Sequence, residues 1–386
     1  MIEVIDKENC CGCGSCVQIC PVKCLELRTD EEGFWYPQGE KKTCVECGLC
    51  ERVCPILHAE PVCDSIKNAY AGYALDEQVR MKSSSGGIFT VLAEEILREN
   101  GVVFGAAFDD DYLVHHVRVD NIEELERLRG SKYLQSRMEE TYAEALELLK
   151  QGRKVLFTGT ECQIAGLKGF LGKTYENLFT VDILCHGVPS PKVWSRYLNE
   201  KKREYGGEVQ NISFRNKRLG WKKFSMMLKF KNSHVYRKVH IQDSFMRMFL
   251  QNLILRPSCY VCKFKGLKRN SDLTIGDCWG IEVWLPEMDD DKGTSVVLVH
   301  TDKGERLLRK TAPKLVLKEG NVDMLLSPMA ESRRSANMNL ERSVFFQLIN
   351  KGADWRALSK IVAESPYQKL KAIFVRIVRK VGRCVR

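Results

Sequence analysis

Two near-copies of one cysteine phrase at the start of the chain constrain its fold more than any other feature. The first copy spaces its cysteines as Cys-x-x-Cys-x-x-Cys-x-x-x-Cys-Pro over residues 10–21, and the second repeats that spacing over residues 44–55. Three thiolates spaced in this way surround one 4Fe-4S cube, whereas the fourth cysteine, fixed before a proline, reaches the other cube. The phrase therefore predicts a small bacterial-type ferredoxin domain with two 4Fe-4S clusters over residues 1–60.

The crossed pattern assigns eight cysteines to two clusters. The first cluster is predicted to use Cys10, Cys13, Cys16 and Cys54. The second is predicted to use Cys44, Cys47, Cys50 and Cys20. A zinc site or a disulfide knot is the alternative, because Cys-x-x-Cys alone also suits zinc, but two complete copies of the phrase favour iron–sulfur chemistry. The aromatic segment 33–37 between the copies predicts a hairpin that shields the clusters from water.

Length and composition set the broad class of the chain. Its 386 residues are enough for two or three domains, and a content of 44% hydrophobic and 28% charged residues is typical of a globular protein. Seventeen cysteines would suggest disulfides in a small secreted protein, but this chain is large and opens without an apolar signal segment. We therefore expect reduced thiols and a cytoplasmic protein. No stretch approaches the ~20 apolar residues that a membrane span needs.

The formal net charge of +10 is unevenly distributed, with seven lysines and arginines in the tail over residues 369–386. Apolar residues recur between these charges at helical spacing, which predicts a basic amphipathic helix. Such a helix either makes a peripheral contact with an anionic membrane or an acidic partner, or docks on its own protein by its apolar stripe, which we favour. The basic residues belong to no recognisable nucleic-acid-binding motif, so no nucleic-acid partner is expected.

Beyond residue 66, short apolar strands alternate with helices. Strands are expected at 102–108, 154–157 and 179–184, and helices at 88–99, 122–129, 139–151 and 164–171. This alternation predicts an α/β domain with a parallel sheet and right-handed crossovers, in a chain that is α+β overall. We divide it into segments 66–150 and 151–315, followed by a helical, basic tail over 316–386. Such a sheet places its site at the carboxyl ends of its strands.

A third set of cysteines is assembled from distant parts of the sequence. Two of them end predicted strands and two form a Cys-x-x-Cys: Cys162, Cys185, Cys259 and Cys262. Structural zinc fits four thiolates, but a third 4Fe-4S cluster is the better prediction in a chain that already carries two. Cys278 is a fifth candidate for the four positions. His186, beside Cys185, is a candidate proton donor or a structural hydrogen-bonding residue.

Two polar loops suggest a site for an anionic ligand. The first precedes a helix, whose exposed amides and nearby hydroxyls suit a phosphate; it consists of Lys82, Ser83, Ser84, Ser85, Gly86 and Gly87. The second offers one cation and one ring, and consists of Gly130, Ser131, Lys132 and Tyr133. A cation for phosphate and a ring for stacking are what a flavin dinucleotide needs. Neither loop is the G-x-G-x-x-G fingerprint, so NAD is not predicted.

Five short motifs in this order carry a resemblance to a known family. They are Ser83–Gly87, Gly130–Tyr133, Gly159–Gln163, Cys185–Pro189 and Gly276–Gly280. With them the chain resembles the coenzyme F420 hydrogenase/dehydrogenase beta-subunit family, with a dicluster ferredoxin fused in front, over nearly everything up to about residue 310. The sequence departs from the family at Glu161, where proline is common, and at Cys278, where phenylalanine is common. Neither departure removes a predicted ligand.

The resemblance implies an iron–sulfur flavoprotein that binds FAD and holds its cluster with Cys162, Cys185, Cys259 and Cys262. Electrons would pass from ferredoxin or another redox protein through the N-terminal clusters and a third cluster to FAD. A small-molecule two-electron acceptor, coenzyme F420 or another organic substrate, would then receive a hydride. Lys82 and Lys132 would hold anionic groups, and His186 would donate a proton. The alternative is a non-catalytic subunit that connects a partner oxidoreductase or hydrogenase to the ferredoxin pool.

Overall fold

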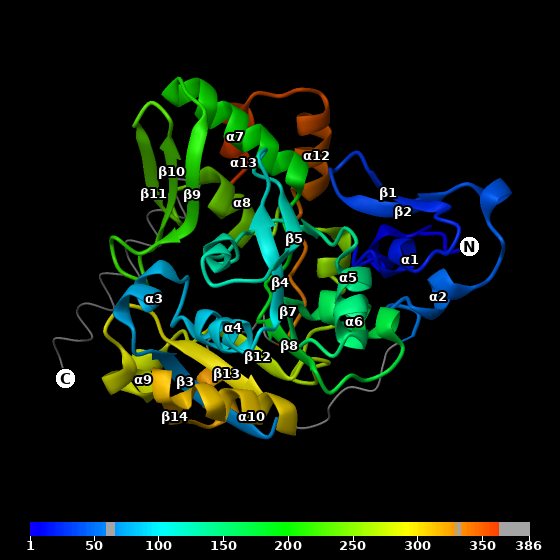
Figure 1. Cartoon of the computed structure of the whole chain (residues 1–386). Helices are drawn as coiled ribbons and strands as arrows, with labels where there is room; N and C mark the ends of the chain where they lie inside the picture. Colours follow the sequence, from blue (N-terminus) through cyan, green and yellow to red (C-terminus); the bar gives the residue numbers. More distant parts are fainter. Residues whose placement is uncertain (59–65, 328, 330–332, 363–386) are drawn as a thin grey trace.

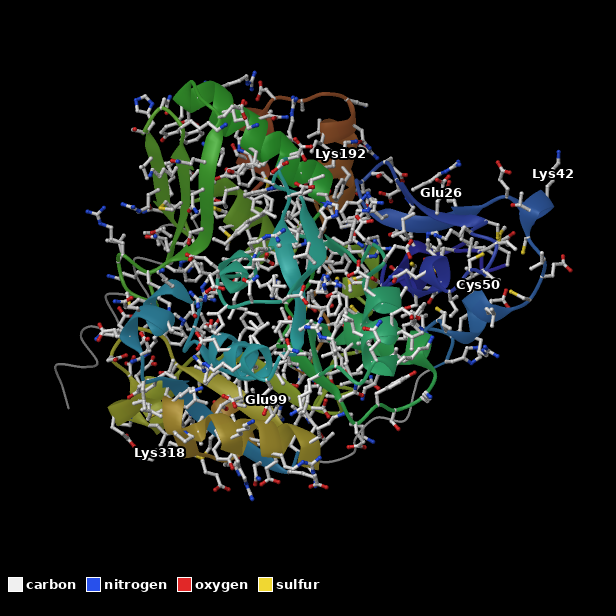
Figure 2. The ribbon with its side chains drawn as sticks, viewed as in Figure 1. Glu26, Lys42, Cys50, Glu99, Lys192 and Lys318 are labelled. Atoms are coloured by element: carbon white, nitrogen blue, oxygen red, sulfur yellow. The ribbon has the colours of Figure 1, made fainter. Side chains whose placement is uncertain are left out.

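The computed structural model describes residues 1–58, 66–327, 329 and 333–362. Its N-terminal domain lies at one edge of the molecule (Figure 1), where Glu26, Lys42 and Cys50 mark it among the side chains of Figure 2. The domain contains two short helices and a hairpin of two antiparallel strands: α1 (Ser15–Gln18), β1 (Leu25–Thr29), β2 (Trp35–Gly39) and α2 (Leu49–Arg52). The predicted hairpin is therefore confirmed, although it is longer than the aromatic segment alone.

The repeated cysteine phrase folds in the same way twice. Gly14 precedes α1 with a φ of 76°, and Gly48 precedes α2 with a φ of 72°. Glycine adopts this left-handed conformation without steric cost, so each phrase can turn sharply into its helix. The third cysteine of each phrase, Cys16 or Cys50, then lies inside the helix and is buried.

The hairpin packs on the rest of the chain. Phe34 and Tyr36 are buried in the same hydrophobic cluster as Trp194 and Leu255, which belong to the main body. The side chain of Gln18 accepts hydrogen bonds from the main-chain amides at the start of α5 (Thr141–Lys150), at 2.9 and 3.3 Å. The N-terminal domain is therefore docked on the main body through both apolar and polar contacts.

A nine-stranded mixed sheet forms the centre of the main body, in the order β14-β3-β13-β12-β8-β7-β4-β5-β6. Its strands are β3 (Asn68–Ala74), β4 (Val102–Phe108), β5 (Val114–Val119), β6 (Ser136–Arg137), β7 (Val155–Thr160), β8 (Leu178–Ile183), β12 (Leu273–Asp277), β13 (Ser295–Val299) and β14 (Leu315–Glu319). The four central strands β12, β8, β7 and β4 run parallel, as predicted. The sheet as a whole is not parallel, because β5 is antiparallel to β4, β13 to both β12 and β3, and β14 to β3. A short turn joins β4 to β5, and so short a connection allows only an antiparallel pair.

Helices cover both faces of this sheet. Alternate residues of β4 face opposite sides, so Val103 packs with α4 (Ile88–Arg98) and α10 (Asp302–Thr311), whereas Phe104 packs with α5 and α6 (Glu161–Leu171). The helices predicted around α4, α5 and α6 are thereby confirmed. Three short helices complete this body: α3 (Glu77–Lys82) follows β3, α9 (Ile281–Trp284) lies between β12 and β13, and α11 (Val322–Leu326) follows β14.

A second layer adds an antiparallel sheet and further helices. The strands are β9 (Val209–Asn216), β10 (Ser225–Phe230) and β11 (Val235–Val239), and the helices are α7 (Pro191–Tyr205), α8 (Ser244–Leu250), α12 (Arg342–Asn350) and α13 (Trp355–Ile361). Their apolar faces form one cluster with the N-terminal hairpin. The expectation of a helical segment from residue 316 is wrong for β14, which continues the central sheet beside β3.

The predicted basic helix over 369–386 lies outside the described residues. Among the residues that are described, no helix combines the length and the apolar character needed to cross a membrane.

Candidate cofactor sites

Two cavities in the N-terminal domain collect the eight predicted ligands in the crossed arrangement. The cavity that we call the first is lined by Cys10, Cys13, Cys16 and Cys54. The second cavity is lined by Cys20, Cys44, Cys47 and Cys50. The proline-flanked cysteine of each phrase thus faces the cavity of the other phrase. Ile2, Cys16 and Cys50 pack together between the two cavities.

Main-chain and hydroxyl groups surround these thiols. The amide of Ile2 donates to Cys50 Sγ at 3.3 Å, and that of Glu46 donates to Cys44 Sγ at 3.4 Å. Such donors suit sulfurs that carry negative charge when they bind metal. Cys47 is exposed, whereas Cys13 and Cys16 are buried, so the second cavity is the nearer one to solvent.

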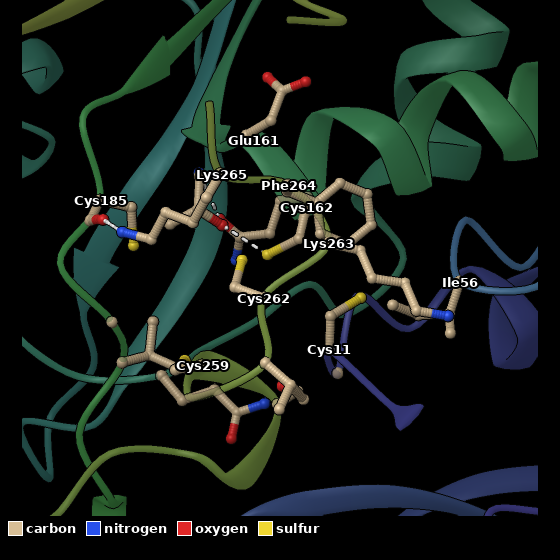
Figure 3. Close-up of a pocket in the computed structure, with 18 of the residues that line it drawn as sticks. Cys11, Ile56, Glu161, Cys162, Cys185, Cys259, Cys262, Lys263, Phe264 and Lys265 are labelled. Carbon is tan, nitrogen blue, oxygen red and sulfur yellow. Dashed lines mark hydrogen bonds between the residues drawn. The ribbon is translucent and has the colours of Figure 1, made fainter. Parts of the chain in front are cut away.

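A third cavity lies at the carboxyl ends of the central strands and is lined by all four cysteines of the third predicted set: Cys162, Cys185, Cys259 and Cys262. Figure 3 shows these side chains around the cavity, with those of Cys162 and Cys262 turned toward one another. Cys162 lies in the first turn of α6, and Thr160 Oγ1 lies 3.1 Å from its sulfur. The cavity contains about 770 Å³ of space not filled by atoms.

The chemistry of this donor set fits an iron–sulfur cluster. Four thiols face one cavity, and soft thiolate ligands select clusters or zinc over hard cations. Burial raises the pKa of Cys185 to about 12 and also raises the pKa of Cys259 and Cys262. Such thiols stay neutral until a bound metal deprotonates them. In the described residues no three His, Cys, Asp or Glu side chains converge closely enough to hold a single metal ion; the cysteines surround a wider space instead.

A fifth cysteine, Cys11, lies between the first and third cavities and lines both. Its thiol interacts with Cys13 on one side and Cys162 on the other, and these interactions raise its pKa well above the usual value. The same contacts lower the pKa of Cys162 and bring that of Cys13 to about 6. No role for Cys11 is predicted from sequence, because it falls outside the cysteine spacing. Only the docking of the N-terminal domain reveals its position.

A large pocket lies next to the third cavity, over the ends of β4, β7, β8 and β12. It contains about 1330 Å³ of space, including its open mouth, which is ample for a dinucleotide. Both predicted polar loops contribute to it, through Ser83, Ser84, Ser85, Gly87, Gly130, Ser131, Lys132 and Tyr133. The pocket and the third cavity share four lining residues, Ser136, Thr160, Gln163 and Val188.

The serine–glycine loop is held mainly by its own hydroxyls. Ser83 Oγ donates to the carbonyl of Val79 at 2.7 Å, and Ser85 Oγ donates to that of Thr294 at 3.0 Å. Ser84 Oγ accepts from the amide of Ser131 at 2.6 Å and so joins the two polar loops. These hydroxyls therefore shape the loop: Ser83 and Ser85 donate their protons to main-chain carbonyls, whereas Ser84 Oγ is an acceptor and keeps its own proton.

Two of the predicted pocket residues point elsewhere. Lys82 does not line the large pocket in the described structure, and its ammonium faces Glu126 at 3.8 Å in solvent. Gly86 lies behind the loop, where a β-carbon would meet the carbonyl oxygen of Gly72 at 2.4 Å. The glycine is needed for this close approach and not for ligand contact.

The cations that line the large pocket are Arg129, which faces Glu94 at 3.8 Å, Lys132 and Arg215. Lys132 Nζ donates to the carbonyls of Arg129 and Gly130 at 3.0 and 3.3 Å, and burial lowers its pKa to about 7. Arg215 forms a bidentate pair with Asp277, at 2.6 and 3.1 Å, and also reaches the hydroxyl of Tyr133 at 3.3 Å. Arg215 was missed because it lies on β9, far along the chain, with no motif around it.

The histidine of the large pocket is His116 and not the predicted His186. His116 Nε2 lies 2.9 Å from the carbonyl of Thr158, so this nitrogen carries the proton, and Nδ1 accepts from Ser136 Oγ at 2.7 Å. Burial lowers the pKa of His116 to about 4 and keeps it neutral. His186 lines the third cavity beside Cys185, and its Nε2 lies 2.7 Å from Asn252 Oδ1.

Cys278 lies apart from the third cavity. It is 1% exposed, in a hydrophobic cluster with Trp221 and Ile281, and does not line any of the four described cavities. The structure therefore places the fifth candidate in the apolar core.

Comparison with known proteins identifies the class of this chain. Residues 9–56 match the model of a 4Fe-4S dicluster domain. The N-terminal domain is thus a two-cluster ferredoxin-type domain, and the chain is an iron–sulfur electron-transfer protein. Residues 69–142 match the N-terminal model of the coenzyme F420 hydrogenase/dehydrogenase beta subunit, and residues 152–324 match the C-terminal model of the same family. The chain therefore belongs to the coenzyme F420 hydrogenase/dehydrogenase beta-subunit family.

Among solved structures, one chain of the F420-reducing NiFe hydrogenase complex from Methanosarcina barkeri, studied by xenon derivatization, is similar in part. The two chains are 19% identical, with a TM-score of 0.46, over 67% of this chain and 84% of that one. No curated protein matches the chain significantly.

Proposed function

We propose that the chain is an oxidoreductase in which electrons enter at the N-terminal clusters, pass a third 4Fe-4S cluster and reach FAD in the large pocket. The electrons then leave for a two-electron acceptor, either coenzyme F420 or another small organic molecule. Bound FAD would supply the conversion of single electrons into hydride transfer. The residues of the chain hold the cofactors, exclude water between them and fix their order.

The observation that carries this proposal is the sequence of adjoining cavities. The second cavity packs against the first through Ile2, Cys16 and Cys50. The first and third cavities share Cys11, Gly12 and Ile56. The third cavity shares four residues with the large pocket. Neighbouring cavities thus share lining or packing residues all the way from the second cavity to the large pocket. Cofactors bound in them would connect an electron donor at the second cavity with the large pocket.

In the large pocket, the chain would hold an anionic ligand with a flavin-like ring. Lys132 faces the pocket without a carboxylate partner among the described residues, so a ligand phosphate would supply its counter-charge. The start of α4 beside Gly87 adds main-chain amides that suit the same phosphate. The ring of Tyr133 is fixed by stacking on Phe249, with centroids 4.8 Å apart. His116, which stays neutral, contributes polarity without charge.

The second candidate function is that of an electron-transfer subunit, which connects a partner enzyme to a ferredoxin pool and has no substrate of its own. The family model describes a beta subunit, which favours this second function. The large pocket favours the first, because a relay subunit needs no open site beside its last cluster.

Anaerobic rapid mixing of the isolated chain with reduced ferredoxin tests the proposal. We expect the flavin absorbance to bleach after cluster reduction, and to recover when F420 or another acceptor is added. A Cys262→Ser variant should keep its FAD and its N-terminal clusters but lose flavin bleaching by ferredoxin. Full cluster reduction without flavin bleaching, in a chain that turns over only with a second protein, would establish the subunit function instead.

A further inference from the structure

Arg256 is a buried cation between the N-terminal domain and the main body. Its side chain is completely inaccessible to water, and no carboxylate among the described residues forms an ion pair with it. Burial of a lone charge is strongly unfavourable, because the ion loses its hydration. The position of Arg256 therefore requires an anionic counterpart nearby.

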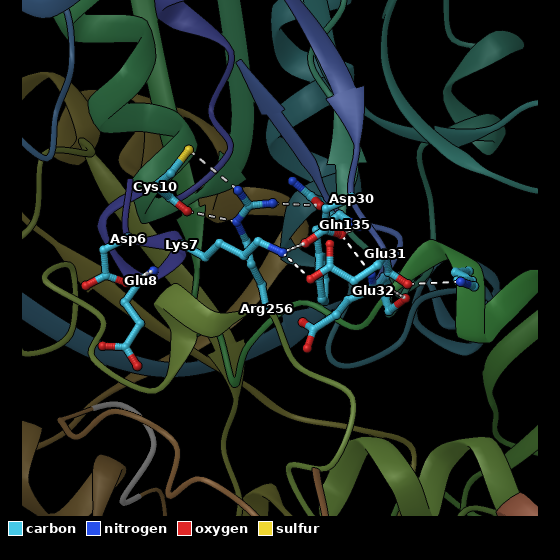
Figure 4. A network of polar contacts seen from close by, with 12 residues as sticks. Asp6, Lys7, Glu8, Cys10, Asp30, Glu31, Glu32, Gln135 and Arg256 are labelled. Carbon is cyan, nitrogen blue, oxygen red and sulfur yellow. Dashed lines mark hydrogen bonds and ion pairs between the residues drawn. The ribbon is translucent and has the colours of Figure 1, made fainter. Parts of the chain in front are cut away.

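The guanidinium of Arg256 is directed at Cys10, which lines the first cavity (Figure 4). Its Nε donates to the carbonyl of Cys10 at 2.9 Å, and its Nη2 lies 3.5 Å from Cys10 Sγ. Its Nη1 donates to Gln135 Oε1 at 3.1 Å, and the ring of Tyr36 lies 4.1 Å from its central carbon. The cation is thus oriented by four contacts, two of them with a predicted ligand of the first cluster.

The local backbone is built to allow this approach. Gly12 has a φ of 72°, and a β-carbon there would meet Gln135 Nε2 at 2.4 Å and the guanidinium carbon of Arg256 at 3.0 Å. Glycine is therefore needed at this position both for its conformation and for space. The main chain of Arg256 belongs to the loop of the third cavity, because its carbonyl accepts from the amide of Cys259 at 2.9 Å.

We propose that Arg256 is the counter-charge of the first 4Fe-4S cluster and raises the reduction potential of that cluster more than the potentials of the others. The inference rests on the proposed ligand set Cys10, Cys13, Cys16 and Cys54, and not on the flavin. Reduction adds one electron and no proton to an already anionic cluster, so a fixed positive charge favours the reduced form. Net charge and hydrogen bonds to the sulfurs are the protein's means of setting such a potential.

The consequence is a directed one-electron step between the two N-terminal clusters. When the second cluster is oxidised and the first is reduced, the electron moves toward Arg256 and toward the third cavity. The side chain of Arg256 contacts a cysteine ligand and not the iron itself. Arg256 is therefore not a catalytic residue, and its charge acts on the distribution of the electron between the clusters.

Redox titration of the whole chain, followed by electron paramagnetic resonance, tests this inference. In Arg256→Met we expect the potential of the first cluster to fall most, so that the equilibrium constant for electron sharing between the two N-terminal clusters falls at least about tenfold, which is about 59 mV for one electron. Arg256→Lys, which keeps the charge, should reverse most of this fall in potential.

Two control variants accompany this titration. Arg28→Gln removes an exposed guanidinium from the same domain and should leave all potentials unchanged. A Cys13→Ser variant identifies the first cluster by its altered spectrum.

Gln135→Glu provides the decisive measurement if Arg256→Met does not retain its iron. Gln135 Nε2 has no hydrogen-bond partner, so a carboxylate replaces the amide without loss of a donor contact and neutralises Arg256 in place. The same potential should fall in this variant. Unchanged potentials in an iron-replete variant, an equal fall of all of them, or a larger shift of the second cluster would overturn the inference. Loss of flavin or of the third cluster in the wild-type chain would contradict the proposed function but not this role of Arg256.

Discussion

We propose that Lys132 contributes most to the binding of an anionic ligand in the large pocket. Its ammonium has a pKa of about 7 in the ligand-free chain because of burial. An anionic ligand raises that pKa, and the chain must then take up a proton when it binds at higher pH. Below pH 7 Lys132 is charged in both states, so affinity is constant there; above pH 7 it falls by up to about tenfold per pH unit until the pKa of the bound state is reached.

We predict that Lys132→Met weakens FAD binding by about tenfold or more at pH 6.5, since a charged hydrogen bond contributes about 1.5–3 kcal/mol. The variant should also lose the pH dependence. FAD titration into the flavin-free protein, followed by fluorescence, measures both effects. Lys82→Met is the matched control, because Lys82 lies outside the pocket. An equal loss in the control, or none in Lys132→Met, would contradict the assignment.

Two neighbouring cysteines of the third cavity should behave differently. Cys262 is a predicted ligand, whereas Cys11 lies between two sites and belongs to neither ligand set. We predict that Cys262→Ser loses the third cluster, about four irons per chain, and that Cys11→Ser keeps its full iron content. Iron analysis and Mössbauer spectra of both anaerobic proteins provide the comparison. Iron loss in Cys11→Ser with retention in Cys262→Ser would show that Cys11, and not Cys262, is a ligand of the third cluster.

At the scale of elements, α6 adds a close contact to those that dock the N-terminal domain on the main body. Gly166 lies in α6, and a β-carbon there would meet Cys13 Cβ at 2.7 Å and Cys13 Sγ at 3.0 Å. Ser15 Oγ also donates to the carbonyl of Gly166 at 2.8 Å. The helix can approach the first cavity this closely only because position 166 has no side chain.

We predict that Gly166→Ala destabilises the docked arrangement by about 1–3 kcal/mol, the usual effect of overpacking. Loss of cluster absorbance in a urea titration under argon should occur at lower urea than in the wild type. Glu147→Ala, on an exposed surface of the neighbouring α5, is the control. An unchanged midpoint in Gly166→Ala would show that the N-terminal domain is stabilised independently of α6.

The elements that sequence predicted well are those with a strong apolar pattern. β4 has the expected bounds, and α4 differs by one residue at its end, because both are continuous buried segments between clear breaks. The predicted helix over 122–129 is only a 3-10 turn over Glu124–Arg127, and β14 was missed in a segment expected to be helical. Both depend on tertiary contacts that a local pattern does not contain.

Sequence likewise predicted one part of the candidate site and missed another. Local spacing was enough to group the eight N-terminal cysteines, and strand ends were enough to bring Cys162 and Cys185 to one cavity. Arg256, Arg215 and Cys11 could not be found, because each acquires its position from a partner that is distant in sequence. His186 lines the third cavity beside Cys185, as expected, whereas His116 of the large pocket was missed, because nothing in its local sequence indicates a pocket.

At the scale of the whole molecule, the cavities form one path from solvent to the large pocket. Exposed Cys47 marks its outer end and the open pocket marks its inner end. Arg256 and Cys11 lie where the N-terminal domain meets the main body. Docking of the N-terminal domain therefore also brings the first cavity next to the third.

The cofactor content of the anaerobically purified chain tests the central claim most directly. Three four-iron sites predict about twelve irons and twelve acid-labile sulfides per chain, and the large pocket predicts one FAD. A chain with about eight irons and no flavin, even after reconstitution with iron, sulfide and FAD, would contradict the account and leave only the N-terminal clusters.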